Sequence, residues 1–235
     1  MKRVMLVALA MLCVAQPAFG QAEACRIPGT LQLPGPIRQD EPTIRAAVAG
    51  YTLAVSWSPE FCQGPGGRNP RNAVQCGGQG RSQGAPFGFI LHGLWPEARS
   101  GPAPQWCTPP APISVQTYRD NVCMTPSPWL LQHEWAKHGT CMVADPARYY
   151  QTAAILWRSL RLPDPSRIRS VGELRAAFVA GNPAFTRGGV GLVTGKGGWL
   201  REMHLCYGAD FMPATCRRDM LGPRDAAPLK VARRR

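Results

Sequence analysis

The first regular pattern of apolar and polar positions in this chain covers residues 51–57, YTLAVSW. Large apolar side chains at the odd-numbered positions alternate there with smaller or polar residues, which is the two-residue period of a half-buried β-strand. This segment therefore predicts the first core strand.

A second apolar segment, residues 86–97, reads PFGFILHGLWPE and predicts a short strand that ends at Gly93 and Pro96. His92 would then lie where the strand ends, a usual place for a functional side chain on a rigid support. Two more strand-like segments, GVGLV and REMHLCYG, follow in the last quarter of the chain.

Capping signals predict three helices between the early and the late strands. Ser127 precedes a proline and can cap a helix that Gly139 would stop. Asp145 starts a second helix, and Ser170 with Glu173 forms a capping box for a third. Strands early, helices in the middle and strands late indicate an α+β domain, with a central, largely antiparallel sheet packed with helices.

The two ends of the chain differ in composition from its middle. Residues 1–20 have a basic start, an apolar run and a small-residue ending, which is the layout of a secretory signal peptide. We expect residues 21–50 to form an N-terminal extension, residues 51–216 one compact domain, and residues 217–235 a basic, disordered tail. No second apolar run approaches the roughly 20 residues of a membrane span.

These features predict an exported monomer, periplasmic or secreted, without a membrane anchor. A lipid anchor at Cys25 is disfavoured because Glu23 and Ala24 do not form a small apolar lead-in. Without the basic residues of the signal peptide, Lys2 and Arg3, 25 basic residues face 14 acidic ones, a formal charge of 25 − 14 = +11. Such a chain attracts polyanions, either nucleic acid or an acidic membrane surface.

The chain has nine cysteines, of which Cys13 would leave with the signal peptide. An even number in an exported protein indicates four disulfides, and hence a fold stapled by disulfides, although eight cysteines allow roughly 100 pairings. Closeness in sequence favours Cys62 with Cys76 and Cys206 with Cys216. A zinc site is the alternative, but no cysteine pair has the two-residue spacing of a zinc knuckle.

The segment LLQHEWAKHGTC, residues 130–141, concentrates the ionisable groups His133, Glu134, Lys137 and His138. At about 100° per residue, these four fall within an arc of roughly 140° on a helix, so all can face one cleft. The zinc protease motif needs two histidines four positions apart, whereas these lie five apart. A solvated helix face is the other alternative. The chain has 23 arginines and four lysines, so a lysine here hints at a need for a compact ammonium donor.

A histidine on a strand next to such a helix would complete a set of groups suited to phosphodiester cleavage. One imidazole removes a proton from the nucleophile and the other gives a proton to the leaving oxygen. Lys137 and Glu134 could stabilise the transition state, and His133 could hold a phosphate oxygen. No metal or other cofactor is needed if the nucleophile is a ribose 2′-hydroxyl, which would restrict the substrate to RNA.

The segments FILHGLWPE and HEWAKHGTC resemble the two active-site segments of the ribonuclease T2 family, a family of exported endoribonucleases. LAVSWSPEFC resembles the opening strand of that family, and HLCYGADFMPATC its closing hairpin. The resemblance covers residues 51–216 and implies an α+β catalytic domain. It also implies cleavage of single-stranded RNA to 2′,3′-cyclic phosphate ends, followed by slower hydrolysis to 3′-phosphates.

The resemblance also implies a role for each residue of the two segments. His138 matches the general base, His92 the general acid, Glu134 and Lys137 the pair that stabilises the transition state, and His133 the phosphate-binding histidine. All five positions hold the expected residue type, which favours an enzyme over a basic RNA-binding or host-directed protein that uses the fold without turnover.

Two further residues match base-binding positions of the family. Trp95 matches the tryptophan that stacks on a base, and Glu97 stands where an acidic base-binding residue is common. Stacking accepts any base, so we expect low base specificity. Without the resemblance, Trp95 is equally well explained as a core aromatic, Glu97 as a surface charge, and His204 as an isolated strand histidine.

Cys141 ends the second active-site segment, and we expect it to tie the catalytic helix to an upstream loop. Its partner is Cys107 or, alternatively, Cys123. Cys25 has no assigned partner.

Overall fold

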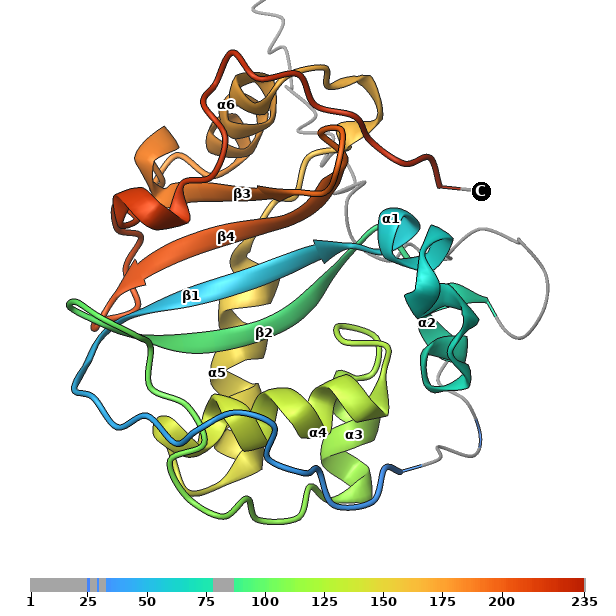
Figure 1. The fold of residues 1–235 in the computed structure, drawn as a ribbon, viewed down its shortest axis with the longest axis vertical. Coiled ribbons are helices and arrows are strands. Elements are labelled where there is room, and N and C mark those ends of the chain that lie inside the picture. Colours follow the sequence, from blue (N-terminus) through green and yellow to red (C-terminus); the bar gives the residue numbers. More distant parts are fainter. Residues whose placement is uncertain (1–24, 26–28, 30–32, 78–86, 235) are drawn as a thin grey trace, which may run out of the picture.

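A computed structural model describes residue 25, residue 29 and the ranges 33–77 and 87–234, while the predicted signal peptide lies outside the described residues. Four strands form one antiparallel sheet in the order β2-β1-β4-β3 (Figure 1). The strands are β1 (Val48–Trp57), β2 (Phe89–Ala98), β3 (Val190–Thr194) and β4 (Leu200–Gly208). The predicted α+β class and antiparallel sheet are confirmed.

The helices surround the sheet. Their bounds are α1 (Ser58–Gln63), α2 (Ala73–Cys76), α3 (Val115–Asn121), α4 (Pro128–Lys137), α5 (Pro146–Ser159) and α6 (Val171–Gly181). In Figure 1, α5 crosses behind the sheet, α3 and α4 lie below β2, and α6 lies above β3. The three predicted N-caps form, because the side chains of Ser127, Asp145 and Ser170 each accept a backbone N–H of the first helical turn.

The two faces of the sheet have different roles. Leu53 and Val55 of β1 and Met203 of β4 are buried in the main core cluster. The opposite face carries polar residues at the alternate positions, among them Ser56 and Glu202, which lie directly opposite each other in the register of β1 and β4. The sheet therefore buries one face and offers a row of polar side chains on the other.

The prediction that β2 ends at Gly93 and Pro96 is wrong. The strand continues to Ala98, and its pairing shifts from Val55 with Leu91 to Ala54 with Gly93. His92 is thus the extra residue of a β-bulge within the strand, a device that redirects a side chain without ending the sheet. A proline is tolerated later in the strand because β2 is an edge strand.

The structure has four disulfides, Cys25–Cys123, Cys62–Cys76, Cys107–Cys141 and Cys206–Cys216. Three of them join cysteines that the sequence analysis paired. Cys107 rather than Cys123 bonds to Cys141, because Cys123 is taken by Cys25, which the sequence left without a partner.

The C-terminal tail is not disordered over residues 217–234, so that prediction is wrong. Leu229 and Ala232 are buried, and the indole N–H of Trp57 donates to the Ala232 carbonyl at 2.8 Å. Lys230 forms a backbone bridge with Trp199. Apolar residues between the arginines dock the tail against the end of the sheet (Figure 1), which its overall composition conceals.

Candidate active site

The carboxylate of Glu134 lies at the centre of the predicted site. Glu134 is 2% exposed, although α4 carries it next to the solvent-facing side of the sheet. The indole N–H of Trp95 donates to its Oε2 at 2.6 Å. Gly93 lets the helix approach β2 this closely, because a Cβ at that position would overlap Glu134 Oε2 and lie 2.7 Å from Trp95 Nε1.

Two histidines face this carboxylate from different elements. His92 Nε2, from the bulge in β2, lies 3.4 Å from Glu134 Oε1. His138 Nε2, at the C-cap of α4, lies 4.0 Å from Glu134 Oε2. His138 Nδ1 is buried and bonds to no described residue, so Nε2 is the nitrogen left to exchange a proton with a substrate.

The environment drives the pKa values of the two imidazoles apart. Burial opposes protonation of His92, but the charges and hydrogen bonds of Glu134 and Glu202 outweigh it and raise its pKa to about 10. Burial dominates at His138 and lowers its pKa to about 4, despite the attraction of Glu134. Burial also opposes ionisation of Glu134, yet the neighbouring histidines keep its pKa below the usual value. A protonated and a neutral imidazole therefore flank one ionised carboxylate.

Lys137 lies on the same helix, and its charge also lowers the pKa of His138. Its ammonium group is paired with the carboxylate of Glu41, with 2.6 Å between Nζ and Oε1. This contact lowers the pKa of Glu41. Residues 33–47, which precede β1, therefore reach the site, although the sequence showed no role for them.

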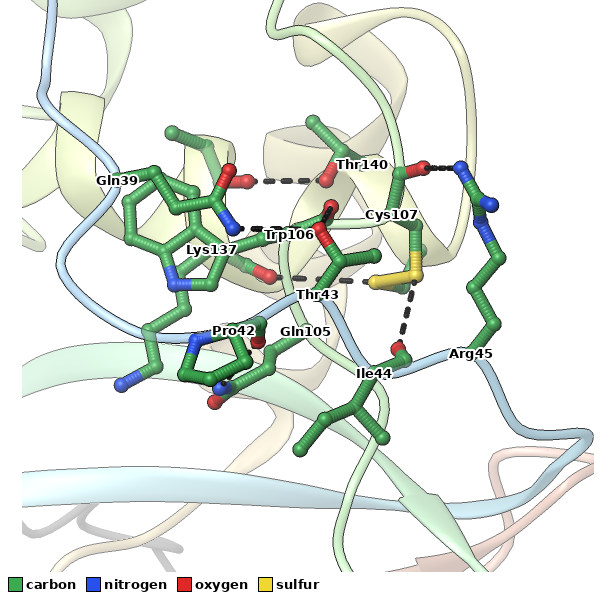
Figure 2. Close-up of a disulfide and its surroundings, with 12 residues drawn as sticks. Gln39, Pro42, Thr43, Ile44, Arg45, Gln105, Trp106, Cys107, Lys137 and Thr140 are labelled. Carbon is green, nitrogen blue, oxygen red and sulfur yellow. Dashed lines mark hydrogen bonds between the residues drawn. A yellow bond between two sulfur atoms is a disulfide. The ribbon is translucent and has the colours of Figure 1, made fainter.

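Backbone and side-chain bonds hold this N-terminal segment in place (Figure 2). Ile44 and Gln105 exchange two backbone hydrogen bonds at 3.0 Å each, and the Thr43 hydroxyl donates to the Trp106 carbonyl at 3.1 Å. The Trp106 N–H in turn donates to the carbonyl of Lys137 at 2.7 Å. The Cys107–Cys141 disulfide joins the same loop to the turn that follows α4.

His133 lies apart from the Glu134 cluster. Its ring stacks on Trp129, with 5.0 Å between centroids, and meets the edge of Trp106 at 5.7 Å. The structure therefore brings His92, Trp95, Glu134 and His138 together and leaves His133 in an aromatic clamp beside them.

A cavity of about 550 Å³ opens beside Trp95. It is lined by residues that include Trp95, Glu97, His204 and Arg217. Glu97 accepts a hydrogen bond from the Thr52 hydroxyl at 2.8 Å, and its burial raises the pKa of its carboxyl. Trp95 also contacts the rings of His92 and His138, with centroids 5.4 and 5.3 Å away, so it forms the wall between the cavity and the Glu134 cluster.

Sequence reasoning missed three polar residues at this site, Ser56, Glu202 and His204. They form hydrogen bonds with one another or with His92. One signal was available, since Glu202 and His204 lie two positions apart and so share a face of their strand. The pairing of β4 with β1, which brings that face to His92, is not visible in a single sequence.

A protonated and a neutral imidazole around a buried carboxylate, in a strongly basic chain, suit acid–base chemistry on a polyanionic substrate. Across the residues that the structure describes, no group of three or more His, Cys, Asp and Glu side chains is arranged to hold a metal ion. No helix in the described ranges has the length and apolar character to cross a bilayer.

Comparisons with known proteins give the family. The model of the ribonuclease T2 family matches residues 49–165. A ribonuclease of Aeromonas hydrophila is 33% identical over 184 residues, which are 72% of this chain and 77% of that one. A probable ribonuclease of Haemophilus influenzae is 29% identical over 187 residues, or 74% of this chain and 62% of the relative. The chain belongs to the ribonuclease T2 family and is an endoribonuclease.

Solved structures agree on the fold. RNase NT in complex with 5′-AMP matches with a TM-score of 0.59 and 17% identity, over 79% of this chain and 98% of that one. An RNase-related protein from Calystegia sepium matches with a TM-score of 0.57 and 17% identity, over 80% and 98% of the two chains.

Proposed function

We propose that this protein cleaves single-stranded RNA by transphosphorylation, leaving 2′,3′-cyclic phosphate ends that it then hydrolyses to 3′-phosphates. The reaction uses no metal and discriminates little between bases. The observation that carries this proposal is that His92 and His138, on the two sides of Glu134, have pKa values shifted in opposite directions, raised for His92 and lowered for His138. A cyclising reaction needs one group to take a proton and another to give one, and these two histidines are prepared for those tasks.

In the first step, His138 Nε2 takes the proton of the ribose 2′-hydroxyl. The 2′-oxygen forms a bond to phosphorus, the bond from phosphorus to the 5′-oxygen breaks, and His92 Nε2 gives its proton to that leaving oxygen. In the second step His92 Nε2 takes a proton from water, the water oxygen forms a bond to phosphorus, the bond from phosphorus to the 2′-oxygen breaks, and His138 Nε2 gives its proton to that 2′-oxygen. Two P–O bonds are thus broken in turn, and both histidines return to their starting states.

Glu134 and Lys137 would stabilise the extra negative charge of the phosphorane-like transition state. The Lys137 ammonium does so by direct attraction to the phosphate. To reach the phosphate, it must break its ion pair with Glu41 or contact both groups at once. Glu134 acts through its negative charge, which lies 3.4 Å from His92 Nε2 and 4.0 Å from His138 Nε2. His133 would contact a phosphate oxygen from its aromatic clamp.

The cavity beside Trp95 is suited to a base. Trp95 offers a ring face for stacking and Glu97 a carboxylate for the polar edge of the base. Related structures are described as complexes of RNase NT with 5′-AMP and of RNase MC1 variants with 5′-GMP and 5′-UMP. Stacking contributes roughly 1–3 kcal/mol per base whatever its identity, which supports low base specificity.

A single ribonucleotide inside a DNA oligonucleotide tests the proposed mechanism. With chelator present, we expect cleavage only on the 3′ side of the ribonucleotide, with a 2′,3′-cyclic phosphate as the first product by mass spectrometry. Four oligonucleotides with A, C, G or U at that position should react within about an order of magnitude of one another, because stacking is tolerant of base identity. Cleavage of the all-DNA control would contradict attack by the 2′-hydroxyl.

The pH dependence of kcat/KM follows from the two histidines. His138 must be neutral, so activity rises as pH increases through its pKa of about 4. His92 must be protonated, so activity falls as pH increases through its pKa of about 10. Initial rates at low RNA concentration from pH 3 to 11 should therefore give a bell whose plateau includes mildly acidic pH. Activity confined to pH values above 10 would refute these assignments.

An RNA-binding protein without turnover is the alternative function. The positions of His92 and His138, 3.4 and 4.0 Å from the carboxylate of Glu134, support the enzyme over this alternative. The four disulfides fit an exported protein, as they persist in oxidising compartments. We propose a periplasmic or secreted protein on this basis.

A further inference from the structure

Glu202 bridges two histidines that come from different strands. Its Oε1 lies 2.7 Å from His92 Nδ1, and its Oε2 lies 2.9 Å from His204 Nε2. The Ser56 hydroxyl donates to Oε1 at 2.9 Å and also lies 3.1 Å from His92 Nδ1. The carboxylate is largely buried, and neighbouring residues on β1, β2 and β4 satisfy both of its oxygens.

This arrangement decides which nitrogen of His92 can react. A carboxylate at Nδ1 requires a proton there, so the neutral ring keeps Nδ1–H, and Nε2 is the nitrogen that gains and loses the second proton. Nε2 faces the proposed catalytic cluster, 3.4 Å from Glu134 Oε1. We propose that Glu202 is a positioning residue for the general acid, with His204 as its support, an inference that rests on the proposed role of His92.

The charges around His92 support the same assignment. Glu134 and His138 face it from α4, and Glu202 faces it from β4, with His204 bonded to the other oxygen of Glu202. Burial alone would raise the pKa of Glu202, but the hydrogen bonds from His204 and His92 hold it far below the usual range. Glu202 therefore stays ionised at any working pH and favours the protonated form of His92.

His204 connects this carboxylate to the base cavity. Its ring meets that of Trp95 with 5.2 Å between centroids and an interplanar angle of 79°, and it lines the cavity beside Glu97. A histidine that the sequence left without a role thus orients Glu202 on one side and contacts the tryptophan of the cavity on the other.

The test compares two substrates that differ in their need for a general acid. The alkoxide leaving group of RNA must be protonated as it departs, whereas a 4-nitrophenolate in a uridine 3′-aryl phosphodiester leaves without a proton. With Glu202→Gln we expect kcat to fall about 10- to 100-fold on RNA, the range typical of partners that orient a reactive group. We expect only a few-fold loss on the aryl ester, little change in KM, and an alkaline limb shifted to lower pH. Glu202→Asp, which keeps a carboxylate, should recover part of the rate.

Glu60→Gln is the matched control, since it removes the carboxylate that pairs with Arg201, the neighbour of Glu202, away from the histidines. It should leave both substrates unaffected. Equal losses of Glu202→Gln on both substrates would show a merely structural role and overturn the inference, as would no loss on either.

His92→Ala separates this inference from the proposed function. If His92→Ala loses activity on RNA but not on the aryl ester, the general acid is established, and the Glu202 variants then decide the positioning role. If His92→Ala shows no such difference between the substrates, the proposed mechanism itself fails, and the inference fails with it.

Discussion

Replacing His138 with alanine should lower kcat/KM for RNA by about 10²- to 10⁴-fold, the usual contribution of a general base. The imidazole is 9% exposed and held neutral by its burial, so it can accept the 2′-hydroxyl proton over the whole mildly acidic range. The residual activity should no longer rise between pH 3 and 5, because the group responsible for that limb is absent. Initial rates across this range measure both effects.

The matched variant is His92→Ala, which should lose a similar factor on RNA but keep the acidic limb and lose the alkaline one. This contrast distinguishes the two roles even though both variants are nearly inactive. Loss of the alkaline limb in His138→Ala instead would mean that base and acid are assigned the wrong way round. Thermal unfolding of each variant shows whether the histidine pair also supports the fold.

The second large effect is expected from Gly93→Ala, a change of one methyl group. The new Cβ would overlap Glu134 Oε2 and crowd the indole nitrogen of Trp95, so the carboxylate between the two histidines must move. A displacement of about 1 Å at a catalytic group can reduce the rate by about 10²-fold. We expect kcat to fall by that order and the unfolding temperature to fall as well, since forcing a methyl group into a packed site costs about 1–3 kcal/mol.

Gly35→Ala provides the control for this substitution, because no atom lies within 4 Å of a Cβ at that position. It should behave as the unmodified protein in both assays. Wild-type kcat in Gly93→Ala would mean that the close approach of α4 to β2 is unnecessary for the reaction.

Local patterns predicted the elements of this fold well. The caps of α4, α5 and α6 lie where the sequence placed them, because a cap depends on residues within one helical turn. The strands that carry His92 and Glu202 were likewise predicted, from a short apolar run and a strand-like segment. Both active-site segments are short and contiguous, which is why their residues could be named in advance.

Features that depend on contacts between distant segments were missed. The bulge at His92 arises from the pairing with β1, and Glu202 reaches His92 only through the order of the strands. Glu41 meets Lys137 across 96 positions of sequence. The tail looked disordered from its arginines and prolines, although its few apolar residues are enough to dock it. In each case, residues remote in sequence supply the deciding interaction.

The disulfide pattern has a consequence for how the chain is made. If the eight described cysteines were oxidised strictly in their order of synthesis, Cys25 would bond to Cys62, Cys76 to Cys107, and Cys123 to Cys141. The native pairs instead nest and overlap, since the Cys25–Cys123 bridge encloses Cys62–Cys76 and crosses Cys107–Cys141. In an oxidising compartment, some cysteines must therefore stay reduced until their native partners are synthesised, or wrong disulfides must rearrange by thiol–disulfide exchange. Such rearrangement takes seconds to hours without an isomerase. We therefore expect the yield of active ribonuclease from any host to increase with the isomerase capacity of that host.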